Sequence, residues 1–160
     1  MRYWNKFLDE HVMNQGSMHG WHRMVGVIAR NIESGEFEKL LESIPLSDQR
    51  KKWATARSGC SEADLANATD KIVDALKKVE SQLGETKWIV GDGYTTADIN
   101  FYAMCGIMVE RMFPEMGVAA NYPRICALRD ARNARPAVQR ALAGKDRTAP
   151  GLRTFTGHVR

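Results

Sequence analysis

The chain has 160 residues, which suits one domain with a hydrophobic core of ordinary size. Hydrophobic residues make up 44% of the chain and charged residues 26%, a composition that is ordinary for a soluble globular protein and does not favour intrinsic disorder. The formal net charge is +4, and no stretch of about 20 residues is apolar enough to form a transmembrane helix.

Two further features concern location and partners. The N-terminus has no apolar run behind a basic start, which predicts a cytoplasmic protein without a secretory signal. Residues 124–160 hold 9 of the 23 Lys and Arg but only 2 of the 19 Asp and Glu, so the positive charge is concentrated there. Its arginines are dispersed and lack interleaved aromatic residues, which favours a solvated helix face over a nucleic-acid site. We therefore expect neither a nucleic-acid partner nor a membrane.

The first predicted helix covers residues 3–30. Residues recur at spacings of three and four, as on one face of an α-helix, at Trp4, Leu8, His11, Gln15, Met18 and His22. A second stripe, which we expect to face the core, consists of Phe7, Val12, Met24, Val25 and Ile28. Gly16 and Gly20 each cost a helix interior about 1 kcal/mol relative to Ala, which suggests a bend or a close approach of another backbone.

Three shorter segments follow. Residues 36–44 form a helical piece that ends before Pro45, because the residue before a proline is pushed out of the helical region. A helical or turn-rich segment then runs from Ser47 to Gly59. Ser61 caps an amphipathic helix, and we expect Gly84 to end it in the left-handed conformation.

The stretch 88–112 is predicted to be a turn followed by a buried helix. Gly91, Asp92 and Gly93 favour a turn. Thr95 and Asp98 have the spacing of a capping box, in which each side chain bonds the backbone amide of the other. Tyr94 and Ile99 are spaced to form a hydrophobic staple across the cap, and the residues after Asp98 are apolar on every side, which indicates a helix surrounded by other helices.

Two prolines begin the last predicted helices, at Pro123 and Pro136, because proline is tolerated at the first helical position. No segment alternates with the period of two that strands require. The sequence therefore predicts an all-α helical bundle over residues 1–144, followed by an irregular basic tail over residues 145–160.

Residues with reactive chemistry do not form a recognisable catalytic pattern. His11, His19 and His22 lie near Asp9 and Glu10, but their spacing matches no metal-binding motif, so we predict no metal site. No serine, cysteine or histidine has a neighbour that would activate it, and we assign no catalytic residue. The three cysteines are an odd number without paired spacing and are expected to be reduced.

The stretch W-I-V-G-D-G-Y-T-T-A-D-I at 88–99 resembles the capped central helix of the C-terminal domain of glutathione transferases. N-A-R-P-A-V-Q-R-A-L at 133–142 resembles the start of that domain's last regular helix. G-W-H-R-M-V-G at 20–26 is similar to bacterial transferases of the aryl-ether-cleaving (β-etherase) type.

This resemblance implies the fold of that helical domain and a place in a glutathione-dependent enzyme. In the family, a thioredoxin-like domain holds glutathione and activates its thiol, while the helical domain supplies the wall for a hydrophobic, often aromatic, electrophile. It also implies a homodimer. The alternative is a non-catalytic helical module that serves protein association.

On the basis of this resemblance, the expected substrate wall is one face of the first helix, formed by Trp4, Leu8, His11, Gln15 and His22. The competing interpretation places Trp4 and Leu8 in the core and the other three at the surface. Thr95 and Asp98 are assigned to folding.

Overall fold

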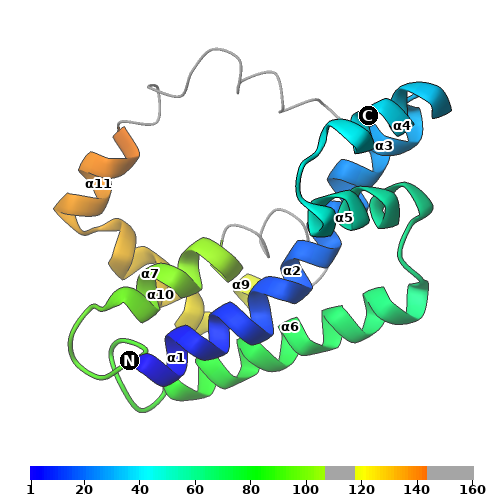
Figure 1. Cartoon of the computed structure of the whole chain (residues 1–160). Helices are drawn as coiled ribbons and strands as arrows, with labels where there is room; N and C mark the ends of the chain where they lie inside the picture. The colour runs from blue at the N-terminus through cyan, green and yellow to red at the C-terminus, as the bar shows by residue number, and fades with distance from the viewer. Residues whose placement is uncertain (107–117, 144–160) are drawn as a thin grey trace.

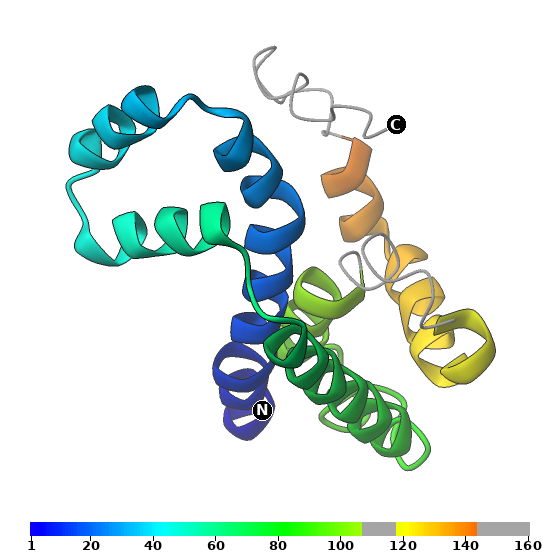
Figure 2. The same cartoon turned by 90° about the vertical axis from the view of Figure 1, so that its right-hand side faces the viewer.

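The computed structural model describes residues 1–106 and 118–143. Across these two ranges the chain is helical, and its β-structure is limited to one isolated bridge between Trp88 and Gly91. Figures 1 and 2 show the long helix α6 (Glu62–Gln82) beside the first helical rod, with α10 (Pro123–Asn133) nearby. The predicted all-α bundle is confirmed for the described part of the chain. None of the described helices has the length and hydropathy needed to cross a bilayer.

The first rod runs unbroken from Arg2 to Asn31 and contains two wide turns. Its segments are α1 (Arg2–Phe7), η1 (Leu8–Val12), α2 (Met13–Gly20), η2 (Trp21–Val25) and α3 (Gly26–Asn31). The segments η1 and η2 are π-helical, so each adds a residue to a turn of the helix.

A helical hairpin packs against the end of this rod that lies far from the N-terminus (Figure 1). It consists of α4 (Ser34–Ser43) and α5 (Ser47–Ser58). The Glu33 carboxylate caps α4 by accepting the amides of Gly35 and Glu36. The rod and α5 meet at Gly26, where an added Cβ would lie 2.9 Å from the carbonyl oxygen of Ala56.

Helix α6 starts at a serine cap and ends without a left-handed residue. The amide of Asp64 donates to the Ser61 hydroxyl, which in turn donates to the Asp64 carboxylate at 2.6 Å. The prediction of a left-handed Gly84 is wrong, because only Gly59 and Gly91 have positive φ among the described glycines. Gly84 instead allows the backbone to pass close to Ser81, because a Cβ at this position would lie 3.0 Å from the Ser81 carbonyl oxygen.

The predicted turn and capping box are confirmed before α7 (Thr96–Phe101). Gly91 has φ +112°. The Thr95 hydroxyl accepts backbone amides of the first helical turn, and the Asp98 carboxylate accepts the amide of Thr95. Asp98 is 1% exposed and also accepts the amide of Ile89 at 2.9 Å. The carboxylate therefore ties the 88–91 turn to the helix that follows it.

The prediction that this central helix is buried on every side is wrong. Phe101 is buried, but Ile99 is 48% exposed and Ala103, in η3 (Tyr102–Gly106), is exposed as well. The helix therefore lies at the edge of the bundle with one face toward the core. The predicted continuation over residues 107–112 lies outside the described residues.

The last described helices are α9 (Val118–Asn121), α10 and α11 (Pro136–Ala143), and prolines begin the last two as predicted. Glu80 of α6 accepts the amides of Arg124 and Ile125, each at 2.9 Å, and so caps α10 from another helix. The Arg135 guanidinium lies 4.1 Å from the centre of the Tyr94 ring. The predicted tail lies outside the described residues.

The main core lies between the first half of the rod, α6, the 88–97 region, α7 and α10. Its members are Trp4, Leu8, Val12, Ile72, Ala75, Leu76, Val79, Trp88, Ile89, Ala97, Phe101, Tyr122, Ile125 and Leu128. Of the predicted second stripe, Val12 is buried, whereas Met24 and Ile28 are 56% and 40% exposed. The prediction that Met24 and Ile28 face the core is therefore wrong.

Candidate functional site

One face of the rod is lined by residues that the sequence did not single out as a group. Asn14, Ser17, Met18 and Trp21 recur at i, i+3, i+4 and i+7, so their side chains lie on one side of the helix. They face α5, which contributes Lys52, Thr55 and Ala56.

The link between α5 and α6 closes this space. Gly59 has φ +89°, a conformation that favours glycine, and its amide bonds the Thr55 carbonyl oxygen at 2.8 Å. The chain therefore turns sharply and places Cys60 and Ser61 opposite the rod. The Cys60 amide donates to Nδ1 of His22 at 3.3 Å, which holds the link against the rod.

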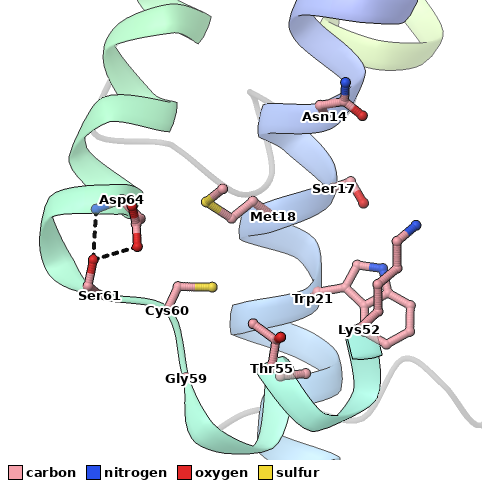
Figure 3. Close-up of a pocket in the computed structure, with 11 residues that line it drawn as sticks. Asn14, Ser17, Met18, Trp21, Lys52, Thr55, Gly59, Cys60, Ser61 and Asp64 are labelled. Atoms are coloured by element: carbon pink, nitrogen blue, oxygen red, sulfur yellow. Dashed lines mark hydrogen bonds between the residues drawn. The ribbon is translucent and has the colours of Figure 1, made fainter. Parts of the chain in front are cut away.

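The space between them is a half-open cavity of about 350 Å³ (Figure 3). Met18, Trp21 and Ala56 give it apolar and aromatic surface, and polar groups lie around them. Trp21 is held edge-on against Trp53, with ring centres 5.8 Å apart. A mostly apolar hollow with a few converging polar groups is typical of small-molecule sites.

Charge is distributed unevenly around the cavity. Lys52 is its lining cation, and Asp64 is its lining carboxylate, bonded to Ser61. Figure 3 shows Lys52 beside Trp21 on one side of the view and Asp64 with Ser61 on the other. Burial, and then the negative charge of Asp64, raise the pKa of the Cys60 thiol, so Cys60 is a weak nucleophile at neutral pH.

A second, more open hollow lies near the N-terminus, beside a ladder of stacked rings. It has a volume of about 320 Å³ and is lined by Tyr3, Lys6, Phe7, Glu10 and His11. The Phe7 ring stacks with Tyr3 at 6.1 Å and with His11 at 5.2 Å, and Lys78 lies 4.9 Å from the Phe7 ring centre.

The structure does not bring the five expected wall residues together. Trp4 and Leu8 lie in the hydrophobic core, 8% and 0% exposed, whereas His11 lines the open hollow. Gln15 is half-buried and lines neither hollow, and His22 supports the link at Cys60. The spacing of Asn14, Ser17, Met18 and Trp21 was a signal that sequence reasoning missed.

Within residues 1–106 and 118–143, no group of three or more His, Cys, Asp or Glu side chains is arranged to hold a metal ion. The cavity offers hydrogen-bonding groups, one cation and an aromatic wall, and its Ser61–Asp64 pair forms the N-terminal cap of α6. Such a set of groups can bind and orient a ligand.

Comparison with known proteins identifies the class. Residues 47–145 match the family described as glutathione S-transferase, C-terminal domain. This match covers more than half of the chain, which therefore belongs to the glutathione S-transferase family and has the fold of its helical C-terminal domain. The family predicted from residues 88–99 and 133–142 is confirmed.

The chain is similar to Protein LigF of Sphingobium sp. (strain NBRC 103272 / SYK-6), with 31% identity over 142 residues, 87% of this chain and 55% of LigF. The crystal structure of beta-etherase LigF from Sphingobium sp. strain SYK-6 matches with a TM-score of 0.79 and 29% identity, over 89% of this chain and 60% of that one.

A further relative is the hematopoietic prostaglandin D synthase of Gallus gallus, 33% identical over 81 residues, 51% of this chain and 39% of that protein. The chain thus spans about half, or less, of the length of the curated relatives it matches.

Proposed function

We propose that this chain is the hydrophobic-substrate domain of a glutathione-dependent enzyme that conjugates glutathione to an aromatic electrophile or cleaves an aromatic ether with it. The observation that carries this proposal is the cavity with Met18 and Trp21 in its wall, in a chain similar to a beta-etherase. In this proposal the cavity takes over the role expected of the face from Trp4 to His22.

Glutathione itself is assigned to a separate glutathione-binding domain. It carries two carboxylates and an ammonium group, whereas the cavity has a largely apolar wall with Lys52 and Asp64 at its sides. This arrangement suits an aromatic group better than a triply charged tripeptide. The residues of this chain then bind the electrophile, orient it and exclude water, and the thiol is supplied from the other domain.

A chimaera tests the proposal: the part of LigF outside the matched region joined to this chain, assayed with glutathione and an aryl ether. We expect glutathione-dependent ether cleavage in the chimaera and none in the chain alone. Trp21→Ala should raise KM, while Trp53→Phe, which keeps an aromatic support, should change it little. A folded chimaera without activity, or turnover by the isolated chain, would contradict the proposal.

A protein-association module is the second candidate, favoured by exposed apolar side chains on the rod. Met24, Val27 and Ile28 are 56%, 39% and 40% exposed at helical spacing. Such a patch is typical of association surfaces, and a homodimer in the cytoplasm is the partner arrangement we propose for it. Sedimentation of the chain with Met24→Lys and Ile28→Lys tests this, because a dimer should become a monomer.

A further inference from the structure

The cavity between the rod, α5 and the α5–α6 link has different chemistry on its two sides, and this difference defines the ligand it would accept. We infer that it binds aromatic molecules that carry a carboxylate, with the ring against Trp21 and Met18 and the carboxylate toward Lys52. The inference rests on the proposed function only in calling that ligand a substrate; the binding stands by itself.

The aromatic end of the site is preformed. Trp21 is fixed by its edge-on contact with Trp53, so its indole face does not have to be ordered when a ligand binds. Met18 adds a thioether, which packs well against aromatic rings, and the small side chain of Ala56 lines the same cavity. Figure 3 shows Met18 on the side of Cys60 and Trp21 on the side of Lys52, so a flat ring seated between them would lie against both.

The position of the ligand carboxylate follows from the charge beside Trp21. Lys52 lines the cavity, and among the described residues no carboxylate lies within ion-pair distance of its ammonium group. The hydroxyls of Ser17 and Thr55 line the same cavity and can donate further hydrogen bonds. An anion is thus attracted to this side.

The opposite side disfavours an anion and fixes the orientation. Asp64 lies there, and its carboxylate already accepts the Ser61 hydroxyl at 2.6 Å. A ligand carboxylate placed beside Asp64 would be repelled. The cavity therefore discriminates between the two directions in which a carboxylate-bearing ring can enter.

The test compares two probes of the same shape, 3-phenylpropionate and 3-phenylpropan-1-ol, titrated into the 160-residue chain without glutathione and followed by calorimetry and ligand-observed NMR. We expect the acid to bind roughly threefold to fivefold more tightly than the alcohol, the range of a partly exposed ion pair, and less so at high salt. Trp21→Ala should weaken both probes.

Matched variants locate the charge effect. Lys52→Gln should remove the preference for the acid, whereas Lys51→Gln, an exposed neighbour outside the cavity, should leave it unchanged. Asp64→Asn should keep or increase the affinity for the acid.

Four results would overturn the inference: no binding of either probe at millimolar concentration, equal affinities, equal effects of the two lysine variants, or binding that survives Trp21→Ala unchanged. Because glutathione is absent, an inactive chimaera contradicts the proposed function without affecting this result. Conversely, an active chimaera with no acid preference contradicts only the inference.

Discussion

Asp98 is a buried carboxylate whose hydrogen bonds all come from one turn and one cap. Its two oxygens accept the amide of Ile89 at 2.9 Å, the amide of Thr95 at 2.7 Å and the Thr95 hydroxyl at 3.0 Å. Hydrogen bonds to a charged group are worth about 1.5 to 3 kcal/mol each, and a donor left unsatisfied in a buried site costs about as much again.

We therefore expect Asp98→Ala to lower the free energy of unfolding by roughly 2 to 4 kcal/mol, more than Thr95→Ala, which should cost about 1 kcal/mol. Urea denaturation measures both. Asp92→Ala, an exposed change in the adjacent turn, is the control and should stay within about 0.5 kcal/mol. Equal losses for Asp98 and Asp92 would refute this account.

Cys60 provides a second residue-scale prediction, which concerns pH. Burial and the nearby Asp64 carboxylate raise the pKa of the thiol, so at a given pH a smaller fraction is thiolate than in the unfolded chain. Alkylation by iodoacetamide, followed by peptide mass spectrometry, should be slower in the folded chain, and its increase with pH should be displaced to higher pH.

Removing the negative charge of Asp64, the second cause of the raised Cys60 pKa, provides the control. Asp64→Asn should move the pH profile of alkylation partway back toward that of the unfolded chain. A folded chain that reacts as fast as the urea-unfolded one at neutral pH would show that the thiol is not held in its neutral form.

Local spacing predicted the residue-scale features that lie within a few positions of each other. Thr95 and Asp98 are three residues apart, so their capping box was readable from the sequence. The hydrogen bond between Asp98 and Ile89 joins residues that are 9 positions apart in the sequence. The cap that Glu80 provides for α10 spans 44 or 45 positions. No local sequence pattern encodes either contact.

At the scale of elements, the first rod explains why one predicted stripe is wrong. Its extent, residues 3–30, was predicted almost to the residue. Each π-helical turn inserts one residue, which shifts the phase of all later positions by about 100° relative to a regular α-helix. Even on a regular wheel Met24 lies about 120° from Val12, so Met24 and Ile28 point outward where Val12 points inward. The face formed by Asn14, Ser17, Met18 and Trp21 keeps regular helical spacing and was overlooked because its side chains are of mixed polarity.

The contact between the rod and α5 depends on a glycine, and two substitutions in the rod separate this effect from helix propensity. Gly26→Ala would place a Cβ 2.9 Å from the Ala56 carbonyl oxygen, and we expect it to destabilise the protein by about 1 to 3 kcal/mol. Gly20→Ala meets nothing within 4 Å and should stabilise it by up to about 1 kcal/mol. Thermal unfolding of the two variants should move in opposite directions, and a shift of the same sign would contradict the close-approach account.

Helix α10 depends on a cap from α6, because its own N-cap residue, Tyr122, provides no side-chain bond. Glu80→Gln retains one acceptor oxygen but not two, and it removes the charge that favours a helix N-terminus. We expect a loss of about 1 to 2 kcal/mol in urea unfolding. Glu85→Gln, at an exposed position, should be nearly neutral, and a similar loss there would show that the effect is one of net charge.

At the scale of the whole molecule, the helices form two packing groups that share the first rod. The main core joins the rod's first half to α6, α7 and α10. The hairpin of α4 and α5 packs on η2 and α3, and its buried residues Phe37 and Ala56 are not part of that core. Segments with few core contacts open at lower free energy than the main core does.

We therefore expect amides of α4 and α5 to exchange with solvent well before those in the middle of α6, as measured by hydrogen exchange with mass spectrometry. Phe37→Ala should speed exchange in the hairpin alone, because Phe37 is buried there beneath the Arg57 guanidinium, 4.3 Å away. The two groups would count as one cooperative unit if α4 and α6 exchanged at the same rate in both proteins.

The position of the cavity connects these two groups. Its walls belong to the rod, to α5 and to the first turn of α6. A ligand bound there therefore contacts both the hairpin and the main bundle. Occupancy must then slow the detachment of the hairpin. By thermodynamic linkage, a substitution that increases the fraction of molecules with a docked hairpin strengthens ligand binding in proportion to that fraction.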